Sequence, residues 1–183
     1  MNEIKTLRQL TSLNQLDFSN KYLIPLDVLI NWEEDTISDL NRYKSLKNTI
    51  INEYKNEFID LKINNLLEKR KIDDKFIHSI KYALNKLINS DIVSFVDDVV
   101  LYGSLARGNN RSNSDIDILL VLDESIKNID NYQKVINKLR GSISTSNIND
   151  PENDLHVVYG NDYKKINNAY YSNILKDGIS LWN

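Results

Sequence analysis

The sequence predicts an α/β (α+β) fold, in which helices flank a small mixed sheet. Up to Ser90 the apolar residues recur at helical spacing, and beyond it the pattern changes to short strand-like runs. The predicted order of helix, strand, loop, strand, helix, strand, strand and helix favours a sandwich of helices on a sheet. The length of 183 residues suits one domain, or one domain with a helical extension.

The first part of the chain is predicted to be helical. In residues 2–10 the apolar positions share one helical face, and Pro25 suits the first position of a second helix. A longer helix is expected to begin with Thr36 as its N-cap, and its apolar stripe runs from Ile37 to Leu61. We expect that stripe to be core or a face for a partner.

The second part of the chain mixes helices and strands. A helix capped by Asp73 or Asp74 carries apolar residues at helical spacing as far as Ile88. Gly141 is expected to close a later helix. The other expected elements are strands at 97–103, 115–123, 142–146 and 154–160, and helices at 128–141 and 163–178.

Composition excludes several classes of protein. There is no cysteine, so neither a disulfide framework nor a thiolate metal site can form. The net charge of -3 is spread evenly along the chain, which argues against a broad basic face that tracks nucleic acid. The N-terminal residues do not resemble a signal peptide, and we find no apolar run long enough to span a bilayer. We therefore expect a cytoplasmic protein with no membrane partner.

Two acidic residues open an apolar strand. Asp115 and Asp117 are two positions apart, so their carboxylates should lie on the same side of the strand and repel each other. A divalent cation removes that conflict, and Mg²⁺ binds carboxylate and phosphate oxygens together. The alternative is that the two acids only solvate the end of the strand.

A polar segment upstream suits phosphate binding. Gly103 ends a strand and lets a phosphate approach the backbone, and Ser104 begins a short helical segment with a free hydroxyl donor. Arg107 and Arg111 are expected either to reach the phosphates or to brace the loop. Each half of this pattern is common by itself, and the combination of the two is the specific signal.

The stretch "GSLARGNNRSNSDIDILLVL" resembles the signature of the DNA polymerase beta-like nucleotidyltransferase superfamily, in particular its small prokaryotic members. The signature residues are Gly103, Ser104, Ala106, Arg107, Gly108, Ser114, Asp115 and Asp117. The resemblance covers about residues 74–183 and implies the polymerase beta-like nucleotidyltransferase fold. We therefore expect a nucleotidyltransferase domain at 73–183, preceded by a helical N-terminal extension at 1–72 that the resemblance does not cover.

The resemblance also implies ligands and site residues. It implies ATP or another nucleoside triphosphate as substrate, held by Gly103, Ser104, Arg107, Arg111 and Ser114. It implies two metal ions, Mg²⁺ or alternatively Mn²⁺, bound by Asp115, Asp117 and a third carboxylate on a neighbouring strand. Asp154 is the best match for the third acid, with Asp150 and Glu152 as rivals, and His156 should share its strand face.

The implied reaction moves a nucleoside monophosphate, AMP by default, onto an acceptor hydroxyl. One metal would hold the triphosphate, and the other, shared with Asp154, would activate the hydroxyl before pyrophosphate leaves. The acceptor is open: a small molecule, a protein or a tRNA. Residues 1–72 are expected to bind a substrate, a second copy of the chain or a helical partner. The alternative reading is an antitoxin-like or regulatory module that uses the fold to bind a partner protein.

Overall fold

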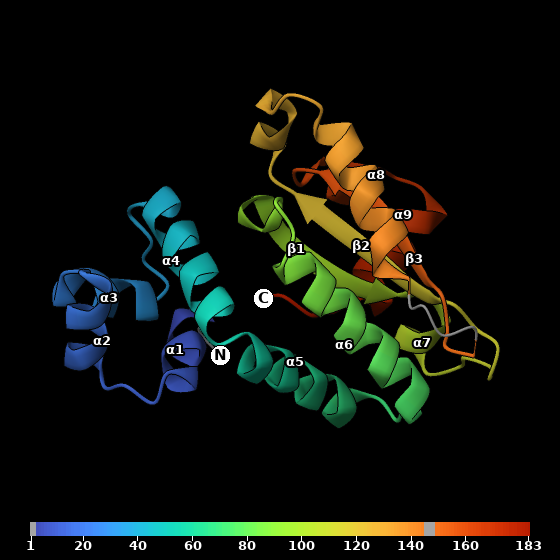
Figure 1. The fold of residues 1–183 in the computed structure, drawn as a ribbon, viewed down its shortest axis with the longest axis horizontal. Helices are drawn as coiled ribbons and strands as arrows, with labels where there is room; N and C mark the ends of the chain where they lie inside the picture. The colour runs from blue at the N-terminus through green and yellow to red at the C-terminus, as the bar shows by residue number, and fades with distance from the viewer. Residues whose placement is uncertain (1–2, 145–148) are drawn as a thin grey trace. The chain divides into compact units, whose positions relative to one another are not determined.

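The structure is a computed structural model that describes residues 3–144 and 149–183, and it separates into two compact units, Met1–Asp60 and Leu61–Asn183. The second unit contains a four-stranded mixed sheet flanked by helices, which confirms the predicted fold class (Figure 1). The division falls within a helix, whereas the domain boundary expected from the sequence follows residue 72. That boundary stays a prediction.

The N-terminal unit is built from helices around a small apolar core. Its helices are α1 (Glu3–Leu10), α2 (Gln15–Tyr22), α3 (Leu26–Glu33), α4 (Leu40–Glu53) and the start of α5 (Lys55–Lys69). Phe18, Leu29, Trp32 and Ile50 are completely buried, and the ring of Tyr43 meets that of Trp32 edge-on at 5.4 Å. Aromatic and aliphatic side chains therefore share the core of this unit.

The prediction of one long helix from Thr36 is wrong. The first helical residue is Leu40, because the N-cap is Asp39, whose carboxylate accepts a hydrogen bond from the backbone N–H of Arg42 at 3.0 Å. The helix ends at Glu53, because the C-cap Tyr54 leaves helical geometry with φ -115° and ψ 41°, and α5 begins at the residue after it. The spacing of apolar residues did not predict α2, whose N-cap Asn14 accepts a hydrogen bond from the N–H of Asp17 through its side chain.

The second unit continues α5 and then forms the sheet. Its elements are α6 (Asp74–Ile88), η1 (Val93–Phe95), β1 (Val96–Tyr102), α7 (Gly103–Arg107), β2 (Ile116–Leu122), η2 (Glu124–Asn128), α8 (Tyr132–Ile143), β3 (Asn153–Tyr159), η3 (Asp162–Lys165), α9 (Ala169–Asp177) and β4 (Ile179–Ser180). The strand order is β3-β2-β1-β4. Strand β1 is antiparallel to β2 and β4, whereas β2 and β3 are parallel and are joined through α8.

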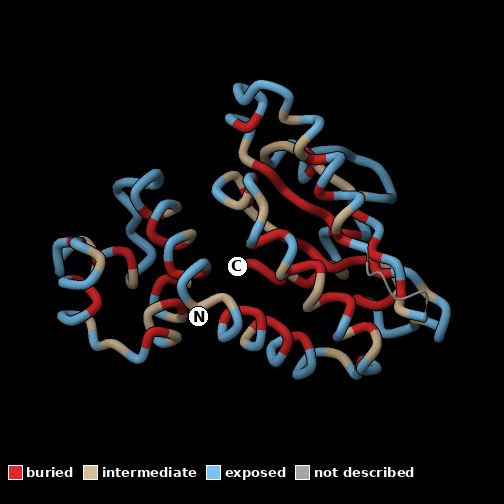
Figure 2. The backbone as a smooth tube through the Cα atoms, viewed as in Figure 1, coloured by how far each residue is buried: buried red, intermediate tan, exposed pale blue. Residues whose placement is uncertain are grey.

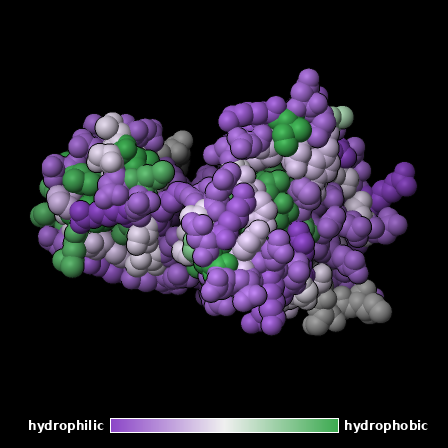
Figure 3. All heavy atoms as spheres, turned by 90° about the horizontal axis from the view of Figure 1, so that it is seen from above, coloured by the Kyte–Doolittle hydropathy of each residue, from purple (hydrophilic) through white to green (hydrophobic). Residues whose placement is uncertain are grey.

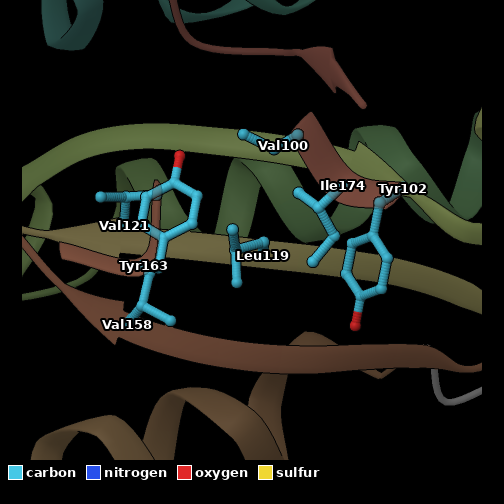
Figure 4. Packing of buried hydrophobic residues seen from close by; sticks show 7 residues of the cluster. All are labelled: Val100, Tyr102, Leu119, Val121, Val158, Tyr163 and Ile174. Atoms are coloured by element: carbon cyan, nitrogen blue, oxygen red, sulfur yellow. The ribbon is translucent and has the colours of Figure 1, made fainter. Parts of the chain in front are cut away.

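Helices cover both faces of this sheet. Helices α6 and α8 pack on one face, and α9 lies on the other (Figure 1). On the α9 face, side chains from three strands, η3 and α9 form one cluster: Val100, Tyr102, Leu119, Val121, Val158, Tyr163 and Ile174 (Figure 4). Strand β2 is central and buried at every position except Asp117 (Figure 2). A half-exposed acid in the central strand needs a functional or structural reason.

Three predictions in the second unit are corrected. Helix α8 begins at Tyr132, and it continues through Gly141 to Ile143 instead of ending at the glycine. A glycine inside a helix costs about 1 kcal/mol, and burial of Leu139 and Ile143 on the sheet offsets that cost. The strand expected at 142–146 is wrong at its first two residues, which are helical, and positions 145–146 lie outside the described residues.

The C-terminal region also differs from expectation. The helix predicted at 163–178 is a 3₁₀ turn, η3, followed by the separate helix α9, whose N-cap Asn168 accepts from the N–H of Tyr171 at 2.8 Å. The short strand β4 was not predicted. It pairs with β1 at the sheet edge, and the N–H of Leu181 extends the pairing to the carbonyl of Val99 at 2.7 Å.

The N-terminal unit exposes several apolar side chains, although it is the smaller of the two units. Leu16, Leu23, Leu26, Ile37 and Leu40 are each at least 36% exposed, and Figure 3 shows apolar patches on the surface of this unit. None of the helices in residues 3–144 and 149–183 has the length and apolar character needed to cross a membrane.

Candidate active site

Three strands bring a row of polar side chains together at one end of the sheet. Tyr102 at the end of β1 is paired with Asp117 on β2, and Asp117 is paired with Asp154 on β3. Paired residues on neighbouring strands project from the same face, and their strands are only about 5 Å apart. The register therefore places the carboxylates of Asp117 and Asp154 side by side on the face that α9 covers.

The charges in this row act on one another. Partial burial raises the pKa of Asp117, and the negative charges of Asp154 and Asp115 raise it further. The positive charge of Arg107 opposes this effect. Asp115 precedes β2 and is exposed, as is Asp154, so Asp117 is the most enclosed of the three acids. The site is an uncompensated cluster of negative charge with one arginine nearby.

Gly103 is fitted to the carboxylate of Asp117. Its φ of +73° is a conformation that residues with a side chain rarely adopt, and a Cβ there would lie 1.8 Å from Oδ2 of Asp117. The absence of a side chain thus gives the carboxylate its position. Gly103 also begins α7, so the strand turns into the helix directly beside the acid.

The loop between α7 and β2 is held by its own backbone. Gly108, at φ +73°, ends α7 and donates its N–H to the carbonyl of Leu105, and the N–H of Asn109 donates to the carbonyl of Ser104. Further on, the N–H of Arg111 donates to Oγ of Ser114 at 2.9 Å. Ser114 therefore shapes the loop in this structure, while the side chains of Arg107 and Arg111 are exposed.

Two basic residues outside the predicted site brace this loop. The Arg70 Nε donates to the carbonyl of Ala106 in α7, and the Lys75 Nζ donates to the carbonyl of Ser112. The Arg70 Cδ also lies 3.6 Å from where a Cβ of Gly108 would stand. Arg70 lies outside the signature segment, which begins at Gly103. No local signal could show that its partner is a carbonyl thirty-six residues away.

Asp150 and Glu152, the alternative candidates for the third acid, lie in different surroundings from Asp154. The carboxylate of Asp150 faces the ring of His78, with 3.8 Å between Oδ2 and Nε2. Glu152 precedes β3 and accepts the backbone N–H of Ile116 through its carbonyl at 2.8 Å. Of the three, Asp154 is the one paired in register with Asp117 and the one whose charge acts on it.

His156 lies two residues beyond Asp154 on β3, so its side chain projects from the same face of the sheet. Its Nε2 is 3.4 Å from the hydroxyl of Tyr171, and its ring meets that of Tyr170 edge-on at 5.5 Å. The tyrosines of α9 were not predicted to take part in the site. Their signal in the sequence is the adjacent pair Tyr170 and Tyr171 beside the N-cap Asn168, which the helical spacing alone did not distinguish.

The carboxylates of Asp115, Asp117 and Asp154 are suitable ligands for a divalent cation, but they do not form a closed metal site. Within the described residues, no group of three or more His, Cys, Asp or Glu side chains is gathered closely enough to hold a metal ion. The three carboxylates repel one another, however, and carboxylate oxygens are the ligands that Mg²⁺ prefers. A cation bound among them would remove the repulsion that raises the pKa of Asp117.

A separate cavity of about 450 Å³ lies in the N-terminal unit between α2 and α4. Its lining includes Lys21, Arg42 and Glu53, and the first and last of these are joined by an ion pair at 2.8 Å. It contains none of the residues predicted from the signature. We therefore place the chemistry on the sheet and not in this cavity.

Comparison with known proteins agrees with that placement. A family described as a nucleotidyltransferase domain matches residues 83–174, a segment that runs from α6 to α9. The match includes every residue that the sequence assigned to the site. A search of curated proteins found no match to the chain.

Proposed function

The chain belongs to the nucleotidyltransferase domain family, and from that premise we propose that residues 61–183 move a nucleoside monophosphate from a triphosphate to an acceptor hydroxyl. Membership confirms the predicted polymerase beta-like superfamily and supports a general nucleotidyl transfer activity. The finer proposal is that the donor is ATP or another nucleoside triphosphate, that Mg²⁺ is required and that pyrophosphate is released.

One observation carries this proposal. Asp117 is the single polar interruption of a buried central strand, and its carboxylate lies against the bare backbone of Gly103 with Asp154 in register beside it. A carboxylate whose pKa is raised by like charges destabilises the fold. Such a cost is expected where the acids serve to bind a ligand.

The residues of the site have separate tasks in this proposal. Asp115, Asp117 and Asp154 would hold Mg²⁺, which supplies positive charge to the triphosphate and lowers the pKa of an oxygen nucleophile. The backbone at Gly103 and Ser104 leaves room for a phosphate, and Arg107 and Arg111 can reach it from the exposed loop. Ser114 would act by fixing the loop through the N–H of Arg111.

Asp154 has a second task in the proposal. It is exposed and paired with Asp117, so an acceptor hydroxyl that approaches from solvent can meet its carboxylate. A carboxylate within hydrogen-bond reach can take the proton of that hydroxyl while the oxygen attacks the α-phosphorus. Catalysis would then depend mainly on positioning and charge neutralisation.

The test is transfer of label from an α-³²P-labelled nucleoside triphosphate, with Mg²⁺ and cell extract. We expect a labelled small molecule, RNA or protein with the wild type, and a loss of roughly a hundredfold or more with Asp117→Asn, the size expected when a key electrostatic group is removed. Asp130→Asn changes an exposed acid outside the site and should keep wild-type activity. Full activity of Asp117→Asn would refute the assignment.

The binding-module alternative rests on the N-terminal unit. Of the stripe first proposed as a partner face, Ile37 and Leu40 are exposed, whereas Tyr43, Leu46 and Ile50 are buried. The exposed apolar side chains of this unit favour contact with a partner more than the stripe itself does. If no triphosphate labels any acceptor, and the chain captures a partner through this unit, the alternative replaces the enzyme proposal. The cytoplasmic location also remains a proposal.

A further inference from the structure

Aromatic side chains surround the acidic end of the sheet on the α9 face. Tyr170 meets Tyr102 edge-on with ring centres 5.8 Å apart, and their hydroxyls are 2.8 Å from each other. The rings of His156 and Tyr171 lie 5.5 and 5.0 Å from that of Tyr170. The ring of Tyr170 is therefore held in place by three aromatic neighbours and one hydrogen bond.

Tyr170 is nevertheless 41% exposed. A tyrosine that is anchored by its hydroxyl and by edge contacts, yet leaves much of its ring open to solvent, presents a rigid apolar surface at little cost in conformational entropy. Its neighbour Tyr102, by contrast, is buried in the cluster of Figure 4.

This open ring lies close to the acids. Tyr102, whose hydroxyl and ring contact Tyr170, is paired with Asp117 across β1 and β2. Burial raises the pKa of Tyr170, and the negative charges of Asp117 and Asp154 add to that effect. Helix α9 also contacts α7, the segment whose backbone the proposed function assigns to the phosphates. The ring thus stands beside both parts of the phosphate and cation site.

We propose that Tyr170 is the stacking surface for the nucleobase of the donor nucleotide. The inference rests on the proposed function, and it adds the residue that binds the base. In a nucleotide the ribose separates the base from the phosphates, so the surface for the base has to lie next to the acids and not among them. Every base has a flat π-face, so stacking on tyrosine binds a base without requiring a particular one.

The other occupant to consider is an aromatic acceptor. The base is favoured because α9 adjoins α7, so the ring is on the same side of the acids as the proposed phosphate segment. The ring of Tyr170 contacts His156 on β3 as well as Tyr102 on β1, but its one hydrogen bond is to Tyr102, whose strand leads directly into α7. An effect on the acceptor alone would therefore point to a different role for the ring.

The test measures binding of unreactive donors to the full chain by calorimetry with Mg²⁺. The probes are the α,β-methylene analogues of ATP, GTP, CTP and UTP, of which the tightest is used, and inorganic tripolyphosphate, which has no base. The variants are Tyr170→Ala and Tyr170→Phe. Tyr132→Ala is the control, because it removes a tyrosine that pairs edge-on with Tyr159 at the opposite end of β3.

We expect Tyr170→Ala to weaken binding of the nucleotide analogue by roughly tenfold, in line with the loss of base stacking. Its affinity for tripolyphosphate should stay within about twofold of that of the wild type. Tyr170→Phe keeps the ring and should stay within a few-fold, and Tyr132→Ala should match the wild type. An unchanged analogue affinity in Tyr170→Ala overturns the inference. An equal loss for both probes also overturns it, because the ring would then act only by supporting the acids.

The same titration separates this inference from the proposed function. If the wild type binds an analogue and Tyr170→Ala binds it equally well, only the role of Tyr170 is wrong. If the wild type binds neither the analogues nor tripolyphosphate, the proposed function fails, and the inference fails with it. A raised KM for the acceptor with unchanged analogue affinity would assign the ring to the acceptor and reject its role for the base.

Discussion

The ion pairs of the N-terminal unit and the acids of the candidate site differ in whether a cation faces each carboxylate. In the N-terminal unit, acids are paired with cations: Glu33 with Arg8 at 2.6 Å, Glu53 with Lys21 at 2.8 Å, and Glu3 with Lys47. In the second unit, the three acids of the site stand beside one another, with Arg107 as the cation that acts on Asp117. Among the residues that the structure describes, none of these three acids forms an ion pair as Glu33, Glu53 and Glu3 do.

The pKa shifts have opposite directions as a result. Burial alone would raise the pKa of Glu33, but hydrogen bonds from Arg8 and Gln15 outweigh it, and the pKa is lowered. The pKa of Asp117 is raised, because burial and the charges of Asp154 and Asp115 all act in one direction. Paired acids stabilise the fold at neutral pH, whereas the site acids weaken it until a ligand supplies positive charge.

The largest effect should come from Gly103→Ala. The new Cβ would collide with the carboxylate of Asp117, and the φ of +73° is strained for alanine, so we expect a loss of about 2 to 4 kcal/mol of unfolding free energy. Nucleotidyl transfer should fall at least as strongly as in Asp117→Asn. Denaturant unfolding and the labelling assay check both effects.

A double-mutant cycle sharpens that prediction. In an Asp117→Ala background the nearest carboxylate atoms are gone, so Gly103→Ala should cost less there and retain mainly its backbone strain. If Gly103→Ala lowers the free energy of unfolding equally in the two backgrounds, Gly103 is required only for its backbone conformation. It would then not be required to make room for the carboxylate of Asp117.

The N-terminal unit should be most sensitive at Arg8. Its guanidinium donates to both carboxylate oxygens of Glu33 and to the carbonyl of Leu13, and Arg8→Ala leaves these acceptors without it, at a cost of about 1 to 3 kcal/mol. The chain has two tryptophans, one in each unit, so Trp32 fluorescence in a Trp182→Phe background reports on this unit. An unchanged unfolding midpoint in Arg8→Ala would contradict a stabilising role for the Arg8–Glu33 pair.

The same pair makes a pH prediction. Because the pKa of Glu33 is lowered from 4.5 in the folded chain, its contribution is fully present above pH 4.5 and is lost as the pH falls through the lower folded value. Acid unfolding followed by Trp32 should therefore begin at a higher pH in Arg8→Ala than in its parent. Identical acid midpoints would show that the pair does not stabilise the unit.

Arg70→Ala should have a smaller effect in the second unit. It removes the hydrogen bond from Nε to the carbonyl of Ala106, which is worth about 1 kcal/mol, and frees the loop that precedes Asp115. Transfer should fall several-fold through kcat, with little change in KM for the nucleotide. Arg70→Lys should restore little, because a lysine cannot reproduce the planar guanidinium that also donates to the carbonyl of Lys69.

The smallest effect should come from Lys21→Ala. Lys21 and Glu53 form an ion pair in which both side chains are about 40% exposed, and such pairs are screened by solvent. We expect no measurable change in the unfolding midpoint of the N-terminal unit. A shift as large as that of Arg8→Ala would mean that pairing itself, regardless of burial, stabilises this unit.

The fold class could be predicted from the sequence, whereas the roles of the candidate site residues remain a prediction. The residues from Gly103 to Asp117 lie in one local segment, so their spacing alone places them near one another. Asp154 is predicted as the third acid because it leads an apolar strand, although its register opposite Asp117 depends on how β2 and β3 pair. The identity of the third acid therefore needs the sheet topology.

The parts that were missed depend on distant contacts or on weak local signals. Arg70 contacts a carbonyl far along the chain, and Tyr170 acquires its place from Tyr102 on another element. The break at Tyr54 divides an apolar stripe whose spacing continues across it, so periodicity predicted one helix where there are two. Gly141 is a typical helix end, but the burial of Ile143 extends α8 beyond it.

The central claim is that Asp115, Asp117 and Asp154 are clustered in order to bind a cation and a nucleotide, and that their mutual repulsion weakens the fold until these ligands bind. The most direct measurement is the thermal midpoint of the wild type and of Asp117→Asn, each with and without Mg²⁺ and an unreactive nucleotide analogue. Without ligand, Asp117→Asn should unfold a few degrees higher, because it relieves like-charge repulsion. With ligand the order should reverse, because only the wild type gains binding energy. A wild type that is the more stable without ligand, and gains nothing from Mg²⁺ and nucleotide, would contradict the claim.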